Sequence, residues 1–351
     1  MTTPDVTTTA LRARLEALTP WQEASTGGDA IAAALVSALA APDAILARLV
    51  EASRIVITGA GSSYYVAQIA AAAFREKSRL PAVAVPLSEL LLRPAGVLAA
   101  APAAAQPVIV ISRSGTTSEA IEVARRMVAA GHPTWAVTGH PDSPMAQAAD
   151  LVLVSPLASE TSIVMTRSFG SMTALLLRLA ARLAADTRFA TDLDALPGAW
   201  SSTAPFVDQG TALAAANPSR VVVLGGGAAY GLANEAVLKL TETGQVPANA
   251  WEPFEFRHGP KSVCEPGMLV VGILGGAAAP AEAQVLAECA ALGATTWALG
   301  DDGPAASLDG IARLPLQLYP LQALALSLAL RRGCDPDAPR HLTQVVVLGE
   351  V

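Results

Sequence analysis

Four hydroxyl side chains cluster around one glycine, directly after a run of apolar residues. They belong to Ser112, Ser114, Thr116 and Thr117, around Gly115. An ordinary turn needs one or two such residues. Ser and Thr hydroxyls donate hydrogen bonds, and a glycine lets the backbone approach a ligand closely. The cluster therefore predicts a site for an anion.

A second group of hydroxyls, Ser62 and Ser63, follows another apolar run that ends at Gly59. Both groups stand where a predicted strand gives way to a predicted helix, and the free N–H groups and dipole of a helix start favour an anion. Arg113 is the one formal positive charge near them, which favours a phosphate monoester on a neutral body. Ordinary N-capping is the competing interpretation. The stretch GAGSSY lacks the G-x-G-x-x-G spacing, so no nicotinamide cofactor is expected.

A third group of chemical residues lies on one face of a predicted helix. Glu235, Lys239 and Glu242 are spaced i, i+4 and i+7, and His258 follows in a loop closed by Gly-Pro. A solvated face of ion pairs is the competing interpretation, and a lone His is usually structural. With an anion site elsewhere in the chain, these groups could instead act on the same ligand.

The elements that must position these groups alternate along the chain. Short β-branched runs alternate with Ala- and Leu-rich stretches after about residue 50, which predicts an α/β fold with doubly wound parallel sheets. The predicted strands are Arg54–Thr58, Ala82–Val85, Val108–Ser112, Thr134–Thr138, Leu151–Val154, Arg220–Leu224, Val270–Leu274, Thr296–Leu299 and Leu314–Leu316. The predicted helices include Tyr64–Glu76, Thr117–Ala130 and Ile163–Ala185.

The two halves of the chain repeat one pattern. RIVITGAGSSYYVAQIA, from Arg54, matches RVVVLGGGAAYGLANEA, from Arg220, at an offset of 166, and the segment from Val108 matches that from Val270 at an offset of 162. Two lobes from one duplicated unit are the simplest account. The second half has Ala, Leu or Gly wherever the first has a hydroxyl. Capping would be needed in both halves, so the contrast favours one anion site per chain, in the first.

We therefore expect three parts. Residues 1–45 form an N-terminal helical segment, residues 46–190 a first, phosphate-binding lobe, and residues 205–351 a second lobe with the charged helix. Residues 186–205, which contain Asp, Thr, Pro and Gly, are expected to connect the lobes.

The composition argues against several classes of protein. The chain has 351 residues, of which 52% are hydrophobic and 15% charged, and its net charge is -7. It can bury a large core, and a negative chain without Lys/Arg clusters suits neither nucleic acid nor an anionic membrane. The apolar stretches are broken by Pro and Arg, and the N-terminus lacks a signal pattern. Three widely spaced cysteines argue against disulfides and zinc and for a cytoplasmic protein.

Five blocks resemble, in the same order, the sugar isomerase (SIS) domain family, in particular the isomerase half of glucosamine-6-phosphate synthase. They are GAGSSYYVA, SRSGTTSEA, YGLANEAVLKLTETG, EFRHGP and CDPDAPRHL, and the match spans roughly residues 45 to 351. The resemblance implies two flavodoxin-like SIS lobes. It also implies that the phosphate of a sugar phosphate is bound by Ser62, Ser63, Ser112, Ser114, Thr117 and the main chain of Arg113.

The resemblance further implies roles for the charged helix. Glu242 would move a proton between C1 and C2 of the sugar, Lys239 would support it electrostatically, and Glu235 is a possible additional member. His258 would open the pyranose ring, reaching in from a neighbouring subunit of a homodimer. Aldose–ketose isomerisation needs one carboxylate over an enediol or enolamine, so no metal or other cofactor is expected.

Two departures from the synthase pattern change the expected reaction. The chain begins Met1-Thr2, without a glutaminase domain and its N-terminal Cys, so we expect no use of glutamine. In the stretch Pro339–Gln344, Gln344 stands where the synthase has the lysine that forms an imine with the ketose. Glutamine cannot form a Schiff base. His341, in the same stretch, is a candidate to replace that lysine.

The block ETSIVMTRSFGSM, from Glu160, looks more like stand-alone family members that act on amino-sugar phosphates. The expected activity is an isomerase/deaminase that converts glucosamine-6-phosphate into fructose-6-phosphate and ammonia. A ketose/aldose phosphate isomerase or a fructosamine-phosphate deglycase is the second interpretation, and a non-catalytic sugar-phosphate sensor is the third. Either configuration at C4, gluco or galacto, is compatible with the sequence.

Overall fold

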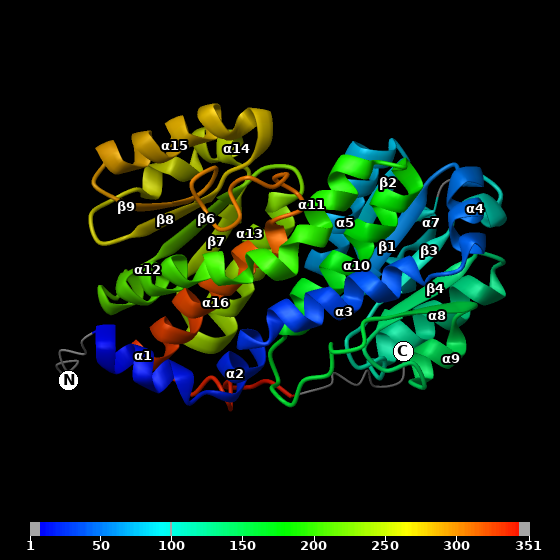
Figure 1. Ribbon diagram of the computed structural model, residues 1–351, viewed down its shortest axis with the longest axis horizontal. Coiled ribbons are helices and arrows are strands. Elements are labelled where there is room, and N and C mark those ends of the chain that lie inside the picture. Colours follow the sequence, from blue (N-terminus) through cyan, green and yellow to red (C-terminus); the bar gives the residue numbers. More distant parts are fainter. Residues whose placement is uncertain (1–7, 99, 344–351) are drawn as a thin grey trace. The chain divides into compact units, whose positions relative to one another are not determined.

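The computed structural model describes residues 8–98 and 100–343 and is drawn in Figure 1. These residues form two compact units. The first lobe comprises Gly27–Glu160, Arg167–Pro197 and Thr343, and the second lobe comprises the described residues up to Thr26, Thr161–Thr166 and Gly198–Leu342.

The first lobe is built on a five-stranded parallel sheet with the order β2-β1-β3-β4-β5. The strands are β1 (Ile55–Gly59), β2 (Ala82–Pro86), β3 (Val108–Ile111), β4 (Thr134–Thr138) and β5 (Leu151–Val154). The helices are α3 (Gly27–Leu39), α4 (Asp43–Glu51), α5 (Ser62–Ser78), α6 (Leu87–Leu92), α7 (Pro94–Val97), η1 (Ala103–Ala105), α8 (Ser118–Ala129), α9 (Pro144–Ala148), α10 (Arg167–Ala184) and α11 (Thr187–Ala199). Every residue of β1, β3 and β4 is buried, as expected for parallel strands covered on both faces.

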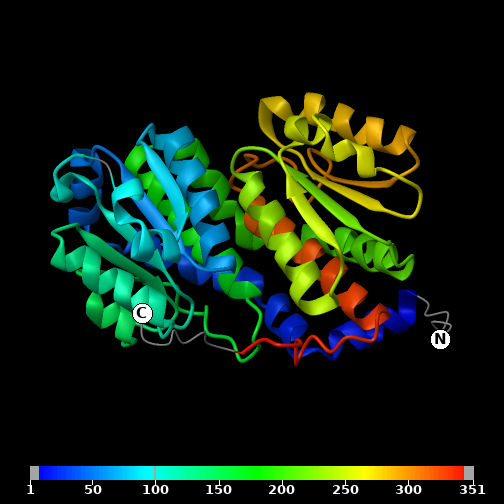
Figure 2. The same ribbon diagram turned by 180° about the vertical axis from the view of Figure 1, so that it is seen from behind.

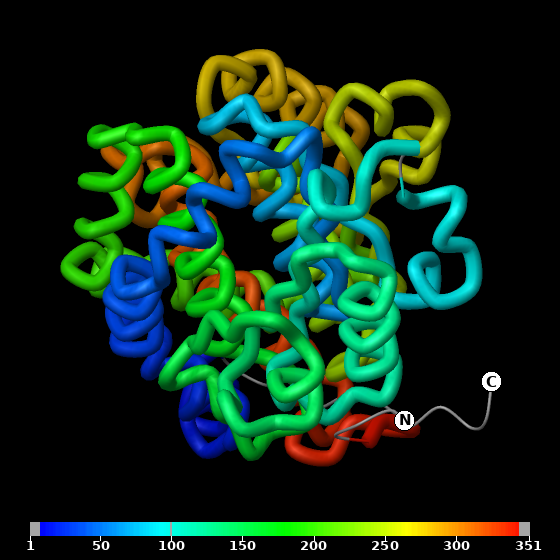
Figure 3. The backbone as a smooth tube through the Cα atoms, turned by 90° about the vertical axis from the view of Figure 1, so that its right-hand side faces the viewer, coloured from blue at the N-terminus to red at the C-terminus, as the bar shows by residue number. Residues whose placement is uncertain are grey.

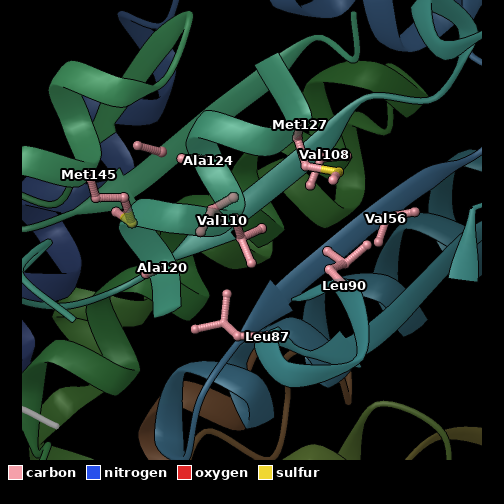
Figure 4. Close-up of a cluster of buried hydrophobic side chains, with 11 residues drawn as sticks. Val56, Leu87, Leu90, Val108, Val110, Ala120, Ala124, Met127 and Met145 are labelled. Carbon is pink, nitrogen blue, oxygen red and sulfur yellow. The ribbon is translucent and has the colours of Figure 1, made fainter. Parts of the chain in front are cut away.

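Helix α8 packs on this sheet through a single apolar face. Its buried residues Ala120, Val123, Ala124 and Met127 follow the spacing of an amphipathic helix, and α9 lies beside it (Figure 3). Figure 4 shows the cluster that they form with side chains of the sheet and of α6: Val56, Val108, Val110, Leu87 and Leu90. This packing fixes the start of α8 at the carboxyl edge of the sheet.

The second lobe has a four-stranded parallel sheet with the order β7-β6-β8-β9. The strands are β6 (Val221–Gly225), β7 (Ala248–Trp251), β8 (Leu269–Ile273) and β9 (Thr295–Leu299). The helices are α1 (Thr8–Glu16), α2 (Thr19–Ser25), η2 (Trp200–Thr203), α12 (Ala204–Ala215), α13 (Ala229–Gly244), α14 (Pro253–Arg257), η3 (Pro260–Val263), η4 (Gly276–Ala278), α15 (Ala279–Ala291) and α16 (Leu314–Arg331). Figure 2 shows α13 and α16 on one face of this sheet and α15 on the other.

The predicted α/β fold with two doubly wound parallel sheets is confirmed. Eight of the nine predicted strands are observed within one residue of their predicted ends. The internal repeat holds as well, because β2-β1-β3-β4 and β7-β6-β8-β9 have the same order. Strands β1 and β6 start 166 positions apart, and the partners Ile57–Ile109 in the first sheet recur as Val223–Val271 in the second.

One predicted strand was wrong, and one observed strand was not predicted. Leu314–Leu316 opens helix α16, with Pro315 in its first turn, because a short apolar run suits a buried helix as well as a buried strand. Residues 186–205, predicted as a connection, contain α11 and η2, and the division between the two lobes falls within them, after Pro197. Strand β7 was not predicted, because its residues Ala248–Trp251 contain no apolar run. It is an edge strand, and its residues alternate between half-buried and exposed.

The predicted N-terminal helices are present within the described residues, as α1, α2 and α3. Helices α1 and α2 belong to the second lobe, whereas α3 and the start of α4 belong to the first. The predicted helix Ile163–Ala185 begins only at Arg167, since Thr161–Thr166 belongs to the second lobe. Within the described residues no single helix is long and apolar enough to cross a membrane; α3 and α4 meet that criterion only as a pair, bent by 74° at the break between them.

Candidate functional site

Residues 112–117, which we call the hydroxyl turn, connect β3 to α8. The hydroxyls fold back onto the turn itself. The Gly115 N–H donates to Ser112 Oγ at 3.2 Å, and that oxygen lies 3.4 Å from Thr117 Oγ1. Thr116 donates to Ser114 Oγ through its N–H at 3.2 Å and through its hydroxyl at 2.8 Å. The structure thus brings the predicted hydroxyls of this turn together in one compact group.

The end of β4 and the start of α9 support the hydroxyl turn. Gly115 has a φ of +64°, and a Cβ at that position would overlap the Oγ of Ser143. The carbonyl of Gly115 accepts a hydrogen bond from the N–H of Met145 at 3.0 Å, and that of Arg113 accepts one from the hydroxyl of Thr138 at 3.0 Å. Glycine is needed here both for the left-handed backbone and for the close approach.

Ser62 and Ser63 are the first two residues of α5 and are buried. A Cβ on Gly59 would lie 2.5 Å from the main-chain carbon of Ser63, so the glycine lets α5 start directly over the end of β1. Because β1 and β3 are neighbours in the sheet, this turn and the hydroxyl turn lie at adjacent strand ends. Thr117, the N-cap of α8, makes no side-chain hydrogen bond to the start of that helix, which weakens the capping interpretation for the hydroxyl turn.

The guanidinium of Arg113 is paired inside the first lobe. Its Nη1 lies 2.9 Å from Oε2 of Glu160, and both side chains are buried. Glu160 also accepts hydrogen bonds from the N–H and the hydroxyl of Ser168, at 2.9 and 2.6 Å. The positive charge of Arg113 is therefore balanced, and the hydroxyl turn offers an anion chiefly neutral donors.

A pocket of about 490 Å³ lies beside the hydroxyl turn. It is lined by Arg113, Ser114, Thr116, His140, Pro141, Asp142, Ser143, Ser159 and Glu160. His140 and Asp142, which belong to the loop after β4, were not predicted as site residues. Their position after a predicted strand of a parallel sheet was a usable signal, since ligands bind at the carboxyl ends of such strands.

In the second lobe, α13 brings Glu235, Lys239 and Glu242 together on one face. The Nζ of Lys239 lies 3.2 Å from Oε1 of Glu235 and donates a hydrogen bond to Oε1 of Glu242. The side chains of Glu235 and Lys239 are 0% and 3% exposed, whereas that of Glu242 is 14% exposed. This is a buried ion-pair group in which Glu242 has some access to solvent, in place of a solvated charged face.

The electrostatics of this group keep Lys239 charged. Burial by itself would lower the pKa of Lys239, but the negative charges of Glu235 and Glu242 and their hydrogen bonds outweigh it and raise that pKa above 10.5. Lys239 is thus a fixed positive charge beside a partly accessible carboxylate. Such a charge can stabilise an oxyanion that develops on a bound substrate.

The remaining predicted residues lie elsewhere. His258 caps the end of α14 and is exposed; the start of α14 is capped by Glu252, whose side chain accepts from the N–H groups of Phe254 and Glu255. His341 is exposed with a φ of +65°. Gln344 lies outside the described residues. Within residues 8–98 and 100–343 no group of three or more His, Cys, Asp or Glu side chains could hold a metal ion.

Comparison with known proteins adds to this geometry. Residues 48–183 and 214–306 match the SIS domain family, which is more than half of the chain. The glutamine–fructose-6-phosphate aminotransferase (isomerizing) of Tropheryma whipplei is 28% identical over 331 residues, covering 86% of this chain and 52% of the relative. That of Gluconobacter oxydans is also 28% identical, with 52% of its length covered. The chain therefore spans about half the length of these curated relatives.

Two solved structures resemble this protein over more than nine tenths of the chain. Glucosamine-6-phosphate deaminase from Thermotoga maritima has a TM-score of 0.79 at 25% identity, covering 94% of this chain and 100% of that one. Tagatose-6-phosphate ketose/aldose isomerase from Escherichia coli has a TM-score of 0.78 at 24% identity, covering 93% and 96%; at this identity the likeness shows the fold. The resemblance inferred from the five sequence blocks is confirmed.

Proposed function

Since the chain belongs to the SIS domain family, whose members similar to it are sugar-phosphate isomerases and deaminases, we propose that it is an amino-sugar-phosphate isomerase/deaminase. The proposed reaction converts glucosamine-6-phosphate and water into fructose-6-phosphate and ammonia, without glutamine. The chain would act as a cytoplasmic homodimer on a small sugar phosphate, with no nucleic-acid or membrane partner.

The observation that carries the proposal is the group on α13, in which the buried, charged Lys239 is hydrogen-bonded to the partly accessible Glu242. A proton transfer between two sugar carbons needs one accessible carboxylate and a nearby positive charge for the oxyanion that forms. The likeness to a deaminase over that protein's full length supports the choice of an amino sugar.

Binding of the substrate phosphate falls to the first lobe. We assign it to the hydroxyl turn, with Ser112, Ser114 and Thr117, to the main chain of Arg113, and to Ser62 and Ser63 at the start of α5. Hydroxyl and N–H donors at a helix start suit a phosphate monoester. The burial of Arg113 against Glu160 supports a site that recognises the phosphate by hydrogen bonds rather than by a free cation.

The chemistry on the sugar then proceeds in balanced steps. His258 moves the proton that opens the pyranose ring and leaves an aldehyde at C1. Glu242 removes the proton from C2 while the oxygen at C1 takes up a proton from solvent, which gives an enolamine. Glu242 then returns its proton to C1 while the amine releases a proton to solvent, which gives an imine at C2 and a hydroxyl at C1. Lys239 stabilises the oxygen at C1 while it carries negative charge.

Hydrolysis completes the reaction. Water adds to C2 of the imine, and the resulting carbinolamine expels ammonia and leaves the ketone of fructose-6-phosphate. Glutamine cannot form a Schiff base with a ketose, so Gln344 fits a path in which water, rather than an enzyme amine, attacks C2. Neither His341 nor Glu235 is given a bond-making role in these steps; Glu235 positions Lys239.

The test is to incubate the purified protein with glucosamine-6-phosphate and to follow ammonia and fructose-6-phosphate together, with galactosamine-6-phosphate in parallel. Equal release of both products supports the proposal. Exchange of the C2 proton with deuterated water but no ammonia would instead indicate a ketose/aldose isomerase or a deglycase. Binding without either signal would indicate a sensor.

The variant Glu242→Gln tests the proposed base. We expect kcat to fall at least about a thousandfold while binding of the sugar phosphate is retained, because an amide cannot accept the C2 proton. Glu265→Gln, at an exposed position of the same lobe, is the matched control. Unchanged turnover in Glu242→Gln would overturn the assignment of the base.

A further inference from the structure

In the second lobe, the turns after β6 and β8 correspond to the two turns of the first lobe that we assign to phosphate binding. A carboxylate lies between these two turns of the second lobe. One turn follows β6 at Gly225, and the other follows β8 at Leu274. Glu282, in the first turn of α15, is 5% exposed and accepts a hydrogen bond from the main-chain N–H of Gly275. The carboxylate is therefore held by the turn after β8.

The same carboxylate fills the space over the turn after β6. A Cβ on Gly226 would lie 2.6 Å from Oε1 of Glu282, so a side chain at this position would displace the carboxylate. The φ of Gly226 is not in the left-handed range, so its backbone conformation does not require glycine. The missing side chain at this position makes room for Glu282.

The first lobe has the opposite arrangement at the matching positions. With the offset of 166, Gly226 corresponds to Ala60, and with the offset of 162, Glu282 corresponds to Ala120, a fully buried residue of α8. Gly275, which donates to Glu282, corresponds to Arg113. The lobe that carries the hydroxyls thus has no carboxylate at this place, and the lobe without hydroxyls has one.

We propose that the second lobe retains a binding site for a phosphate-like oxyanion, and that Glu282 occupies it as an internal anion. The oxyanion would accept the N–H of Gly275 and fill the space over Gly226 once the carboxylate is absent. This site is separate from the hydroxyl turn and from the group on α13.

The charges around the site explain why the carboxylate is an imperfect occupant. The guanidinium of Arg313 is completely buried against the turn after β8; its Nη2 donates to the carbonyl of Leu274 at 3.1 Å and pairs with Asp301 at 2.9 Å. Burial of Glu282 and the negative charge of Glu252 raise the pKa of Glu282, against the hydrogen bond from Gly275. The charge of Glu252 also opposes an external anion, so we expect the emptied site to bind phosphate only in the millimolar range.

The experiment opens the site in a background in which the hydroxyl turn is disabled, Ser114→Ala/Thr117→Val in the full chain. Binding of inorganic phosphate is measured by isothermal titration calorimetry and by phosphorus NMR, before and after adding Glu282→Ala. We expect Glu282→Ala to create one phosphate site per chain, with an affinity at least tenfold above that of the background. Glu282→Ser provides the same vacancy should the alanine variant not fold.

Two matched controls separate the vacancy from the change of charge. Glu265→Ala, at an exposed position of the same lobe, removes one negative charge without opening a space. Glu282→Gln removes the charge but keeps the shape, so we expect it to bind no phosphate. No additional binding in Glu282→Ala and Glu282→Ser, or equal gains in Glu265→Ala, would overturn the proposal.

The outcome is independent of the proposed function. If the variant Ser114→Ala/Thr117→Val still binds one phosphate, the assignment of phosphate binding to the hydroxyl turn is wrong. The additional binding caused by Glu282→Ala still tests the site proposed in the second lobe. The converse exchange in the first lobe, Ala60→Gly/Ala120→Glu, should abolish phosphate binding there, whereas Ala60→Gly alone should not. Retained binding in the double variant would contradict the equivalence of the two sites.

Discussion

Nη1 of Arg113 lies 2.9 Å from Oε2 of Glu160, and the two side chains are 9% and 0% exposed. This pair ties the hydroxyl turn to the last residue of the first lobe before the chain enters the second at Thr161. It also withdraws the one positive charge of the turn from solvent, so the site depends on hydroxyl and N–H donors.

We expect Glu160→Ala to lower the free energy of unfolding by about 3 to 5 kcal/mol, since it leaves the guanidinium of Arg113 buried without its carboxylate. Phosphate binding should weaken at the same time, because Arg113 belongs to the turn. The measurement is urea unfolding together with phosphate titration.

Glu122→Ala is the control for that change. Glu122 pairs with Arg126 at 2.7 Å on the exposed face of α8, and an exposed pair contributes less than about 1 kcal/mol. Equal losses of stability in the two variants would show that burial of the Arg113–Glu160 pair has no energetic consequence.

Gly115→Ala should disable the hydroxyl turn. The new Cβ would overlap Ser143. The left-handed backbone conformation would cost a non-glycine residue about 1 to 2 kcal/mol in addition. We expect a loss of at least about 2 kcal/mol in stability and a loss of phosphate affinity.

Gly227→Ala isolates the backbone part of this effect. Gly227 has a φ of +55°, and nothing lies within 4 Å of the added Cβ. We expect Gly227→Ala to lower the free energy of unfolding by about 1 to 2 kcal/mol, the cost of the backbone strain alone. The phosphate affinity should not change. A larger loss in Gly227→Ala than in Gly115→Ala, measured by urea unfolding, would contradict this account.

Glu23 makes the stability of the second lobe sensitive to acid. Its carboxylate accepts hydrogen bonds from the N–H of Thr161 at 2.6 Å and from the hydroxyls of Thr161 and Ser162. Burial raises its pKa, but these hydrogen bonds outweigh burial and hold the pKa of Glu23 below 4.5. Its contribution to stability is therefore complete above pH 4.5 and is lost as the pH falls through the lowered value.

We expect Glu23→Gln to reduce the free energy of unfolding by about 2 kcal/mol at pH 7, the contribution of hydrogen bonds to a charged group. The difference from the wild type should shrink as the pH falls below 4.5. The measurement is urea unfolding across that range. A difference that grows toward low pH would have the wrong sign for this carboxylate.

Lys239→Met should destabilise the second lobe strongly, because Glu235 is completely buried and would lose its positive partner. The cost of breaking such a pair is about 3 to 5 kcal/mol. The pKa of Lys239 is raised, so its contribution is complete below pH 10.5 and is lost as the pH rises through the higher folded value. Thermal unfolding between pH 7 and 11 should show a constant difference up to about pH 10 that then narrows; narrowing already near neutral pH would rule out a charged Lys239.

Local patterns were enough to predict much of this protein. Eight strands, the repeat, the hydroxyl turn and the face shared by Glu235, Lys239 and Glu242 follow from hydrophobic period and from the spacing of residues close in sequence. The edge strand β7 and the helical start at Leu314 could not be obtained in this way. For both, the deciding contacts come from other elements of the second lobe.

The tertiary structure alone decided what the charged groups do. Arg113 meets a carboxylate 47 positions away, and Glu23 holds a segment 138 positions away. Glu282 fills a turn that follows another strand. A sequence shows which residues can carry charge and donate hydrogen bonds, because that is set by their covalent structure. Which of those charges are balanced inside a lobe depends on burial and on partners distant in the chain, and only folding brings those together.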